Sequence, residues 1–232
     1  MTPSTISTGL YGLDEVTGGG QPGELWLLSG PHGVGTSSLG LGMARASSLG
    51  AGRATCWLST HEQPEVVRWR ALAAQSRTPV DAPASAGGTR LEDASLALDA
   101  APLEITRIDP VLLLREAHVA AEQRPATIFR DHVAQPPSPH VLDFMQQIAT
   151  GGRAWLVAVV AGAALRREAL RRSVADRAVT LVWVERDDLL DPASPRVGEA
   201  DLLVTRPGKR TVTRTVAFQQ RYQRFLEIRV GS

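Results

Sequence analysis

Lysine is almost missing from this sequence of 232 residues: Lys209 is the only one, and arginine supplies the remaining basic charge. Cysteine is as scarce. The single Cys56 excludes an intrachain disulfide and fits a reducing cytoplasm, and the apolar residues around it predict a buried, unreactive thiol. The net charge of +1 excludes a general attraction to nucleic acid or membranes, so either kind of binding needs a local patch.

Long apolar runs are absent too. The longest, at residues 155–165, is well short of the roughly 20 residues that cross a bilayer. Residues 1–8 are polar and lack the apolar core of a secretion signal. With 43% apolar and 21% charged residues, the composition is that of an ordinary globular protein, and the length suits a single domain over residues 1–232. We therefore expect a cytoplasmic protein without a membrane partner.

The sequence does contain a phosphate-binding loop of altered type. Residues 30–37 read Gly-Pro-His-Gly-Val-Gly-Thr-Ser, which is the pattern G-x-x-x-x-G-K-[ST] with threonine at the lysine position. The glycines let backbone N–H groups surround a phosphate, whereas the missing lysine would add positive charge. The alternative is a tight turn that only joins a strand to a helix. The predicted nucleotide-binding residues are Gly30, Gly33, Val34, Gly35, Thr36 and Ser37.

Hydrophobic periodicity predicts strands that alternate with helices. Strands are predicted at residues 24–29, 54–58, 103–108, 126–129, 154–160, 179–184, 202–205, 211–218 and 224–230. Helices are predicted at residues 36–46, 65–75, 111–123 and 141–149, with a short one around 10–13, a weak one at 91–99 and a basic helix or loop at 165–174. This order predicts an α/β fold whose mostly parallel sheet is flanked by helices and ends in an antiparallel C-terminal hairpin edge.

Several motifs resemble a known family. Residues 7–14 and 18–25 resemble the entry segment of the RecA-like ATPase domain of DnaB-type replicative helicases, with RadA and KaiC as more distant relatives. Thr-His-Glu-Gln-Pro at residues 60–64 is similar to the family's SLEMP segment, and residues 179–188 and 211–225 are similar to its last motifs. The resemblance covers nearly the whole chain, without the family's N-terminal domain, and implies a RecA-like P-loop NTPase fold.

The resemblance assigns roles to residues around the loop. Glu62 falls where the family has its water-activating glutamate, although a glutamate near a helix start is also favourable without any catalytic role. Ser37 matches the magnesium-binding hydroxyl, and Asp131 is the candidate for the magnesium-orienting aspartate, beside Arg130. Ala161 ends a strand that in the family ends in a polar glutamine. Three positions thus depart from the family pattern around one site: Thr36, Arg130 and Ala161.

Two basic segments are further candidates. The family inserts an arginine finger into a neighbouring subunit, and the corresponding candidates here are Arg206, Lys209 and Arg210; a solvated hairpin turn is the alternative. A DNA-contacting loop of the family corresponds to the region of Arg166, Arg167, Arg171 and Arg172, where a solvated charged helix face is the alternative. The five histidines and one cysteine show no ligand spacing, so no metal centre of that kind is expected.

The functional expectation is a catalytically degenerate nucleotide-binding or regulatory module associated with DNA metabolism, which binds ATP and Mg²⁺ weakly or not at all. The resemblance implies a homo-oligomer, with a ring and single-stranded DNA as further expectations. One alternative is an active DNA-dependent ATPase or helicase motor in which Arg130 or Lys209 supplies the missing charge. Another alternative is an oligomeric scaffold without turnover.

Overall fold

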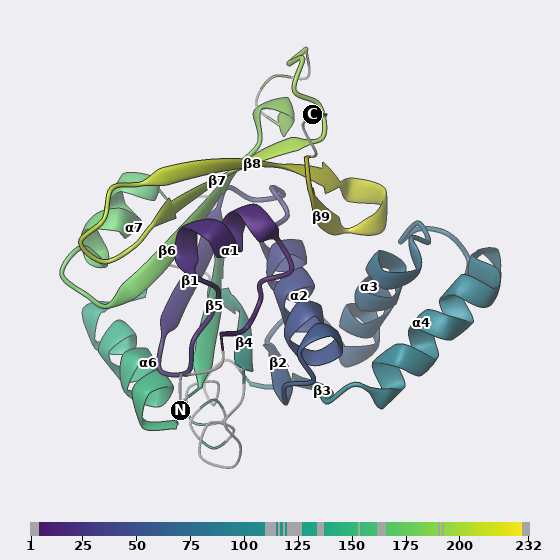
Figure 1. The fold of residues 1–232 in the computed structure, drawn as a ribbon, viewed down its shortest axis with the longest axis horizontal. Helices are drawn as coiled ribbons and strands as arrows, with labels where there is room; N and C mark the ends of the chain where they lie inside the picture. Colours follow the sequence, from purple (N-terminus) through teal and green to yellow (C-terminus); the bar gives the residue numbers. More distant parts are fainter. Residues whose placement is uncertain are drawn as a thin grey trace.

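The computed structural model describes residues 5–109, 115, 117, 119, 127–133, 137–152, 154–161, 166–189, 191 and 193–228, with only the backbone described at 84, 130–133 and 161. This part of the chain forms one nine-stranded sheet in the order β3-β2-β4-β5-β1-β6-β7-β8-β9 (Figure 1). Its strands are β1 Leu25–Gly30, β2 Thr55–Ser59, β3 Leu103–Arg107, β4 Thr127–Val133, β5 Trp155–Ala161, β6 Val179–Glu185, β7 Glu199–Thr205, β8 Val212–Gln219 and β9 Arg224–Glu227.

Helices cover both faces of the sheet (Figure 1). They are α1 Tyr11–Thr17, α2 Thr36–Arg45, α3 Pro64–Ser76, α4 Gly88–Ala100, α6 Pro139–Gly152 and α7 Arg167–Ser173. A π-helical turn, Ala46–Gly50, extends α2, and short 3-10 turns occupy Ala84–Gly87, Asp187–Leu189 and Gln220–Tyr222. Among the described helices, none is both long and apolar enough to cross a lipid bilayer.

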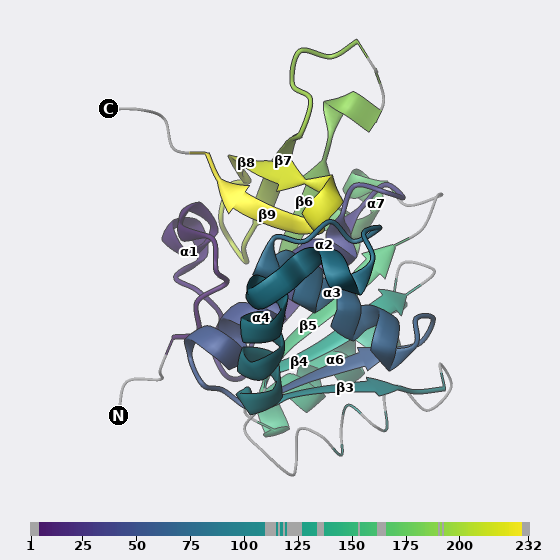
Figure 2. The same cartoon turned by 90° about the vertical axis from the view of Figure 1, so that its right-hand side faces the viewer.

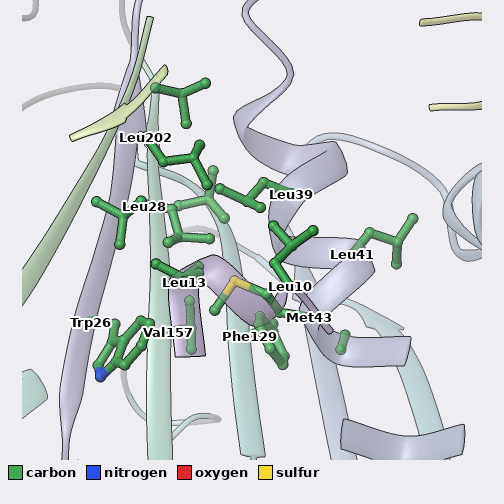
Figure 3. Packing of buried hydrophobic residues seen from close by; sticks show 14 of the residues in the cluster. Leu10, Leu13, Trp26, Leu28, Leu39, Leu41, Met43, Phe129, Val157 and Leu202 are labelled. Atoms are coloured by element: carbon green, nitrogen blue, oxygen red, sulfur yellow. The ribbon is translucent and has the colours of Figure 1, made fainter. Parts of the chain in front are cut away.

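The alternation of side chains along buried strands creates two apolar cores. On β1, Trp26 and Leu28 face one core, whereas Leu25 and Leu27 face the other. The first core lies under α1, α2 and α3, and Figure 3 shows Leu39 and other α2 side chains converging on the sheet. The second core lies under α6 and α7. Burial on both sides explains why β1 reads as an uninterrupted apolar run.

In the order of the sheet, the six strands β3, β2, β4, β5, β1 and β6 run parallel to one another. The strands β7, β8 and β9 continue the sheet, each antiparallel to the strand before it. Figure 2 shows β9 lying above α2, with α1 to one side. This arrangement places the C-terminal hairpin over the helix that follows the phosphate-binding loop. The predicted fold class is therefore confirmed, including the antiparallel edge.

The N-terminal motif has a local structural role. Asp14 accepts hydrogen bonds from the Thr8 backbone N–H at 2.9 Å and from the Thr8 and Ser7 hydroxyls at 2.7 and 2.6 Å. The Gly12 N–H donates to Glu227 Oε1 at 2.8 Å, so the start of α1 is tied to the C-terminal hairpin. Part of the resemblance at residues 7–14 thus reflects how this segment folds.

Most predicted boundaries agree with the structure within a few residues. Two differences stand out. The strand predicted at 126–129 continues to Val133, so it does not end at Phe129. The weak helix predicted at 91–99 is a 13-residue helix, Gly88–Ala100, because it packs against α3. The helix predicted at 111–123 falls mostly outside the described residues.

The aromatic cluster in the first core should be a major source of stability. Phe129 is fully buried and stacks on Trp57 with ring centroids 5.7 Å apart, and it meets Trp155 edge-on at 5.9 Å. We expect Phe129→Ala to lower the free energy of unfolding by about 3–5 kcal/mol, because a cavity replaces the ring. Leu96→Ala, at a 69% exposed position, is the control and should stay within about 0.5 kcal/mol in the same denaturant titration.

Cys56 should be unreactive in the folded chain. The residue lies on β2, where burial, with the nearby Glu104 as a second cause, raises the pKa of its thiol to about 12. The thiolate fraction at pH 8 is then about a thousandfold below that of an ordinary thiol. Iodoacetamide should therefore alkylate native protein slowly and urea-unfolded protein quickly, as followed by mass spectrometry. Equal rates in the two states would contradict the raised pKa.

Candidate phosphate-binding site

The loop between β1 and α2 has the backbone that its glycines predict. Gly33 and Gly35 have φ angles of +85° and +98°. A Cβ on Gly35 would lie 2.9 Å from Phe218 Cζ, and one on Gly30 would lie 2.5 Å from the Val184 carbonyl oxygen. Positions 30 and 35 therefore need glycine for packing, and 33 and 35 need it for backbone conformation.

A pocket of about 400 Å³ lies over this loop. Three segments far apart in the sequence contribute to it: the loop itself, the residues around the start of α3, and the C-terminal hairpin. Outside the loop its lining residues are Ser38, His61, Glu62, Arg70, Phe218, Gln220 and Gln223. The volume lies within the range of small-molecule sites in proteins.

The structure brings together most of the predicted nucleotide-binding residues. Gly33, Gly35, Thr36 and Ser37 all line the pocket. Gly30 is instead the last residue of β1. The side chain of Val34 is buried in the first core, so Val34 anchors the loop from below.

Glu62 lies at the pocket as predicted, but its carboxylate has a partner. Arg70 Nη1 donates to Glu62 Oε2 at 2.5 Å, and Arg70 Nη2 donates to the Ser38 hydroxyl at 3.2 Å. Ser38 in turn donates to Gln223 Oε1 at 2.8 Å. The side chains of Arg70 and Glu62 are 14% and 32% exposed, which makes this ion pair more shielded than a surface pair. The network joins α2, α3 and the C-terminal hairpin.

The sequence analysis missed Arg70, although a signal was present. Arg70 lies three residues after Val67 and four before Ala74, and both of these are buried. Residues at such spacing share one helix face, so Arg70 faces the protein and not solvent. Arg68, in contrast, has a side chain that is 37% exposed and pairs with Asp99 at the surface.

Aromatic rings close the pocket on the side of the hairpin. Phe218 and Phe225 stack with ring centroids 4.5 Å apart, and both contact the position of Gly35. The buried guanidinium of Arg186 lies 4.8 Å from the Phe218 ring centroid and donates two hydrogen bonds to Asp188, at 3.0 and 2.8 Å. These hydrogen bonds lower the pKa of the Asp188 carboxyl. Part of the motif at 185–188 therefore supports the ring that lines the pocket.

Arg130 and Ala161, the two other departures from the family pattern, lie on the neighbouring strands β4 and β5. Asp131 is level with Ser59, the last residue of β2, and the pairing of β4 with β5 shifts between Arg130 and Val133. The side chains of Arg130 and Asp131 are outside the described set, so the predicted magnesium role of Asp131 stays a prediction. Ala161 pairs with Gly30 at the strand end beside the loop.

The β7–β8 turn corrects one expectation. Thr205 pairs with Leu181, near the start of β6, whereas the phosphate-binding loop follows the end of β1. The turn that holds Lys209 therefore lies at the opposite end of the sheet, and Lys209 cannot supply the missing charge to its own pocket. Arg206 donates to the Val16 carbonyl at 3.2 Å. A role of Arg206, Lys209 or Arg210 in a neighbouring subunit stays a prediction.

The basic segment around α7 is partly neutralised by carboxylates. Arg167 pairs with Glu185 at 3.4 Å, and Arg171 pairs with Glu168 at 3.0 Å. The hydrogen bond from Arg171 lowers the pKa of the Glu168 carboxyl. This pairing favours the solvated helix face over a surface dedicated to phosphates. DNA contact by Arg166, Arg167, Arg171 and Arg172 remains a prediction.

Comparisons with known proteins agree with this geometry. No protein-family model matches the chain. Over an alignment of 261 residues, the chain is 25% identical to the replicative DNA helicase DnaB of Leifsonia xyli subsp. xyli (strain CTCB07), covering 96% of this chain and 56% of that protein. The solved ATPase domain of G40P is similar with a TM-score of 0.82 at 13% identity, covering 97% of this chain and 92% of that chain.

A second solved structure, a DnaB-like replicative helicase described with its interactions with primase, has a TM-score of 0.83 at 14% identity and covers 99% of this chain and 63% of that chain. The chain therefore has the RecA-like fold of DnaB-type ATPase domains, and the resemblance found in the sequence is confirmed. The chain spans little more than half the length of the curated relative that it matches.

Glycine at position 35 can be tested directly. We expect Gly35→Ala to lower the free energy of unfolding by at least about 1–2 kcal/mol, because alanine disfavours positive φ and its Cβ would collide with Phe218 and Phe225. Gly42→Ala, within α2 and with nothing within 4 Å of the added Cβ, should instead stabilise by up to about 1 kcal/mol. Chemical denaturation measures both; similar effects at the two positions would contradict this account.

Proposed function

We propose that this chain is a DnaB-like RecA-fold module that binds a nucleotide phosphate weakly and has lost efficient ATP hydrolysis, so that it acts as a binding or regulatory module in DNA metabolism. The observation that carries the proposal is a phosphate-binding loop with retained glycine geometry around a neutral Thr36. Backbone N–H groups still favour an anion there, while the lysine charge that would neutralise the transferred phosphate is missing.

Arg70 provides the pocket with a cation from a different element. Among the described lining residues it is the only arginine or lysine. A guanidinium can hold a phosphate oxygen by charge-assisted hydrogen bonds, which supports weak binding. Arg70 lies on α3 and is hydrogen-bonded to Glu62 and Ser38, whereas the family's lysine lies within the loop itself. We infer that Arg70 contributes to anion affinity without replacing the catalytic lysine.

The engagement of Glu62 supports poor hydrolysis. A general base must accept a hydrogen bond from the attacking water, and one Glu62 oxygen already accepts from Arg70. Loss of one preorganised group that stabilises charge in a transition state costs about 100- to 1,000-fold in rate. The altered loop and the engaged glutamate therefore both oppose turnover.

Magnesium fits this site only in part. The Ser37 hydroxyl and the Glu62 carboxylate line the pocket, and oxygen ligands suit Mg²⁺. When bound, the ion would neutralise phosphate charge. Among the described residues, no group of three or more His, Cys, Asp or Glu is placed to hold a metal ion. Magnesium binding is thus expected to be weak and to depend on nucleotide.

An active motor is the second candidate, because Glu62 remains at the pocket. Such a motor would belong to a homo-oligomer, with single-stranded DNA as activator and an arginine from a neighbouring subunit supplying charge. Oligomerisation and DNA binding are proposals for this chain. Turnover stimulated by single-stranded DNA and abolished in Glu62→Gln would favour this candidate over the degenerate module.

The decisive experiment combines ATP binding by calorimetry with a phosphate-release assay, with Mg²⁺ and with or without single-stranded DNA. We expect measurable binding without turnover above background. Arg70→Gln should weaken ATP binding about tenfold or more, because a hydrogen bond to a charged group is lost, while the control Arg68→Gln should leave it unchanged.

Thr36→Lys alone should not restore strong turnover, since Arg130 and Ala161 are separate departures from the family pattern. Strong turnover in that single variant would contradict the proposed degeneracy. Absence of any ATP binding at millimolar concentration would contradict the binding function.

A further inference from the structure

A second pocket, of about 300 Å³, lies further along α2. Its walls come from residues 8–10, one side of α2 and of the π-helical turn that follows it, Gln75 near the end of α3, and β9. Figure 2 shows α2 and β9 as neighbours, with residues of both elements in contact. Of the residues that line this pocket, Ser38 is shared with the pocket over the phosphate-binding loop, so the two are adjacent but separate.

Two arginines meet in this second pocket without a carboxylate. Arg45, from the last turn of α2, donates through Nη2 to Gln75 Oε1 at 2.7 Å. Arg224, from β9, donates through Nε to Gln219 Oε1 at 2.7 Å, and its guanidinium lies 5.9 Å from the Tyr222 ring centroid. Both hydrogen-bond partners are neutral amides. Arg45 Nε is buried and has no hydrogen-bond partner among the described residues.

Other arginines of the described chain show what is missing here. Arg186 has Asp188, and Arg196 donates to three carboxylates, of Asp187, Glu199 and Asp201. Arg70 has Glu62. Among the residues that the structure describes, no carboxylate lies within ion-pair distance of Arg45 or Arg224. A shielded cation without a counterion is costly, so two of them in one pocket are unusual.

The charges of these two arginines also oppose each other. Burial lowers the pKa of Arg45 to about 10, and the charge of Arg224 adds to this effect. Burial likewise lowers the pKa of Arg224, with the charge of Arg77 as the next cause. Arg45 remains protonated at neutral pH, because a pKa of about 10 lies well above 7. A bound anion would relieve the repulsion between them.

We propose that this second pocket, called here the arginine pocket, binds a small phosphomonoester. The two guanidinium groups match the two charges of a phosphomonoester, and their planar donors suit its oxygens. Leu49, Phe225 and Leu226, which are only partly buried, give the pocket an apolar wall for the organic part. The volume is at the lower end for ligand sites, which favours a compact ligand over a triphosphate. The proposal does not depend on the function proposed for the phosphate-binding loop.

Phenyl phosphate is a suitable probe because it joins a dianion to a small apolar ring. Calorimetry on the full chain should detect its binding, and Arg45→Gln and Arg224→Gln should each weaken that binding at least about tenfold, since each removes a charged donor. The matched control Arg68→Gln should not change it. Benzoate, a monoanion of similar shape, should bind more weakly than phenyl phosphate.

Arg70→Gln separates the two pockets. The change should leave phenyl phosphate binding intact, whereas ATP binding at the phosphate-binding loop should fall. Loss of phenyl phosphate binding in Arg70→Gln alone would place the ligand in the other pocket and overturn the proposal. Unchanged binding in folded Arg45→Gln and Arg224→Gln, or no binding to the unmodified chain, would overturn it as well. Circular dichroism confirms that each variant is folded.

An acidic side chain of a second copy is the competing occupant. In that case Arg45→Gln would lower the oligomeric mass in analytical ultracentrifugation without affecting phenyl phosphate. This outcome would also overturn the proposal. A melting temperature that rises with phenyl phosphate in the unmodified chain, but not in Arg224→Gln, would support it through an independent measurement.

Discussion

The parallel pairing of β1 with β5 and β6 is the interaction on which the rest of the structure depends. All six residues of β1 are buried, and the side chains of the first four alternate between two apolar cores. This pairing fixes where β1 ends, and therefore where the phosphate-binding loop begins. In this register the last residue of β5, Ala161, lies beside Gly30. The carbonyl of Val184 approaches Gly30 so closely that no side chain fits there. The site is assembled at this edge because the strands next to β1 end together.

Packing and chemistry make separate demands on the loop. Gly30 and Gly35 are required by neighbouring backbone and aromatic rings, whether or not a phosphate binds. A lysine at position 36 would be needed for its charge, and Thr36 fits the first turn of α2 with 5% of its surface exposed. The loop can therefore hold this shape without a cation at position 36. For this reason the glycine pattern by itself is evidence of ancestry and geometry, and evidence about hydrolysis must come from the charged groups around it.

Much of the fold could be predicted from the sequence, because it depends on local patterns. The two-sided burial of β1 and the alternation of strands with helices are visible as apolar periodicity, and the loop is visible as a motif. The Arg70–Glu62 pair was not predicted, since it joins α3 to a loop eight residues earlier and depends on how the helix is rotated. The length of β4 was underestimated because Arg130 and Asp131 look like the end of an apolar run. The arginine pocket depends on Arg45 and Arg224, which are 179 positions apart in the sequence, and no local pattern connects them.

The arginine content of the chain acquires meaning only when each guanidinium is considered with its partners. The α7 region looks basic in sequence, yet Arg167 and Arg171 pair with carboxylates of the same chain, so part of its charge is matched. Arg45 can be explained in part as a cation in the last turn of α2, where the helix dipole favours it. That explanation does not extend to Arg224, which lies on a strand and whose positive charge repels that of Arg45. The proposed anion site in the arginine pocket therefore rests on unmatched charge and not on total charge.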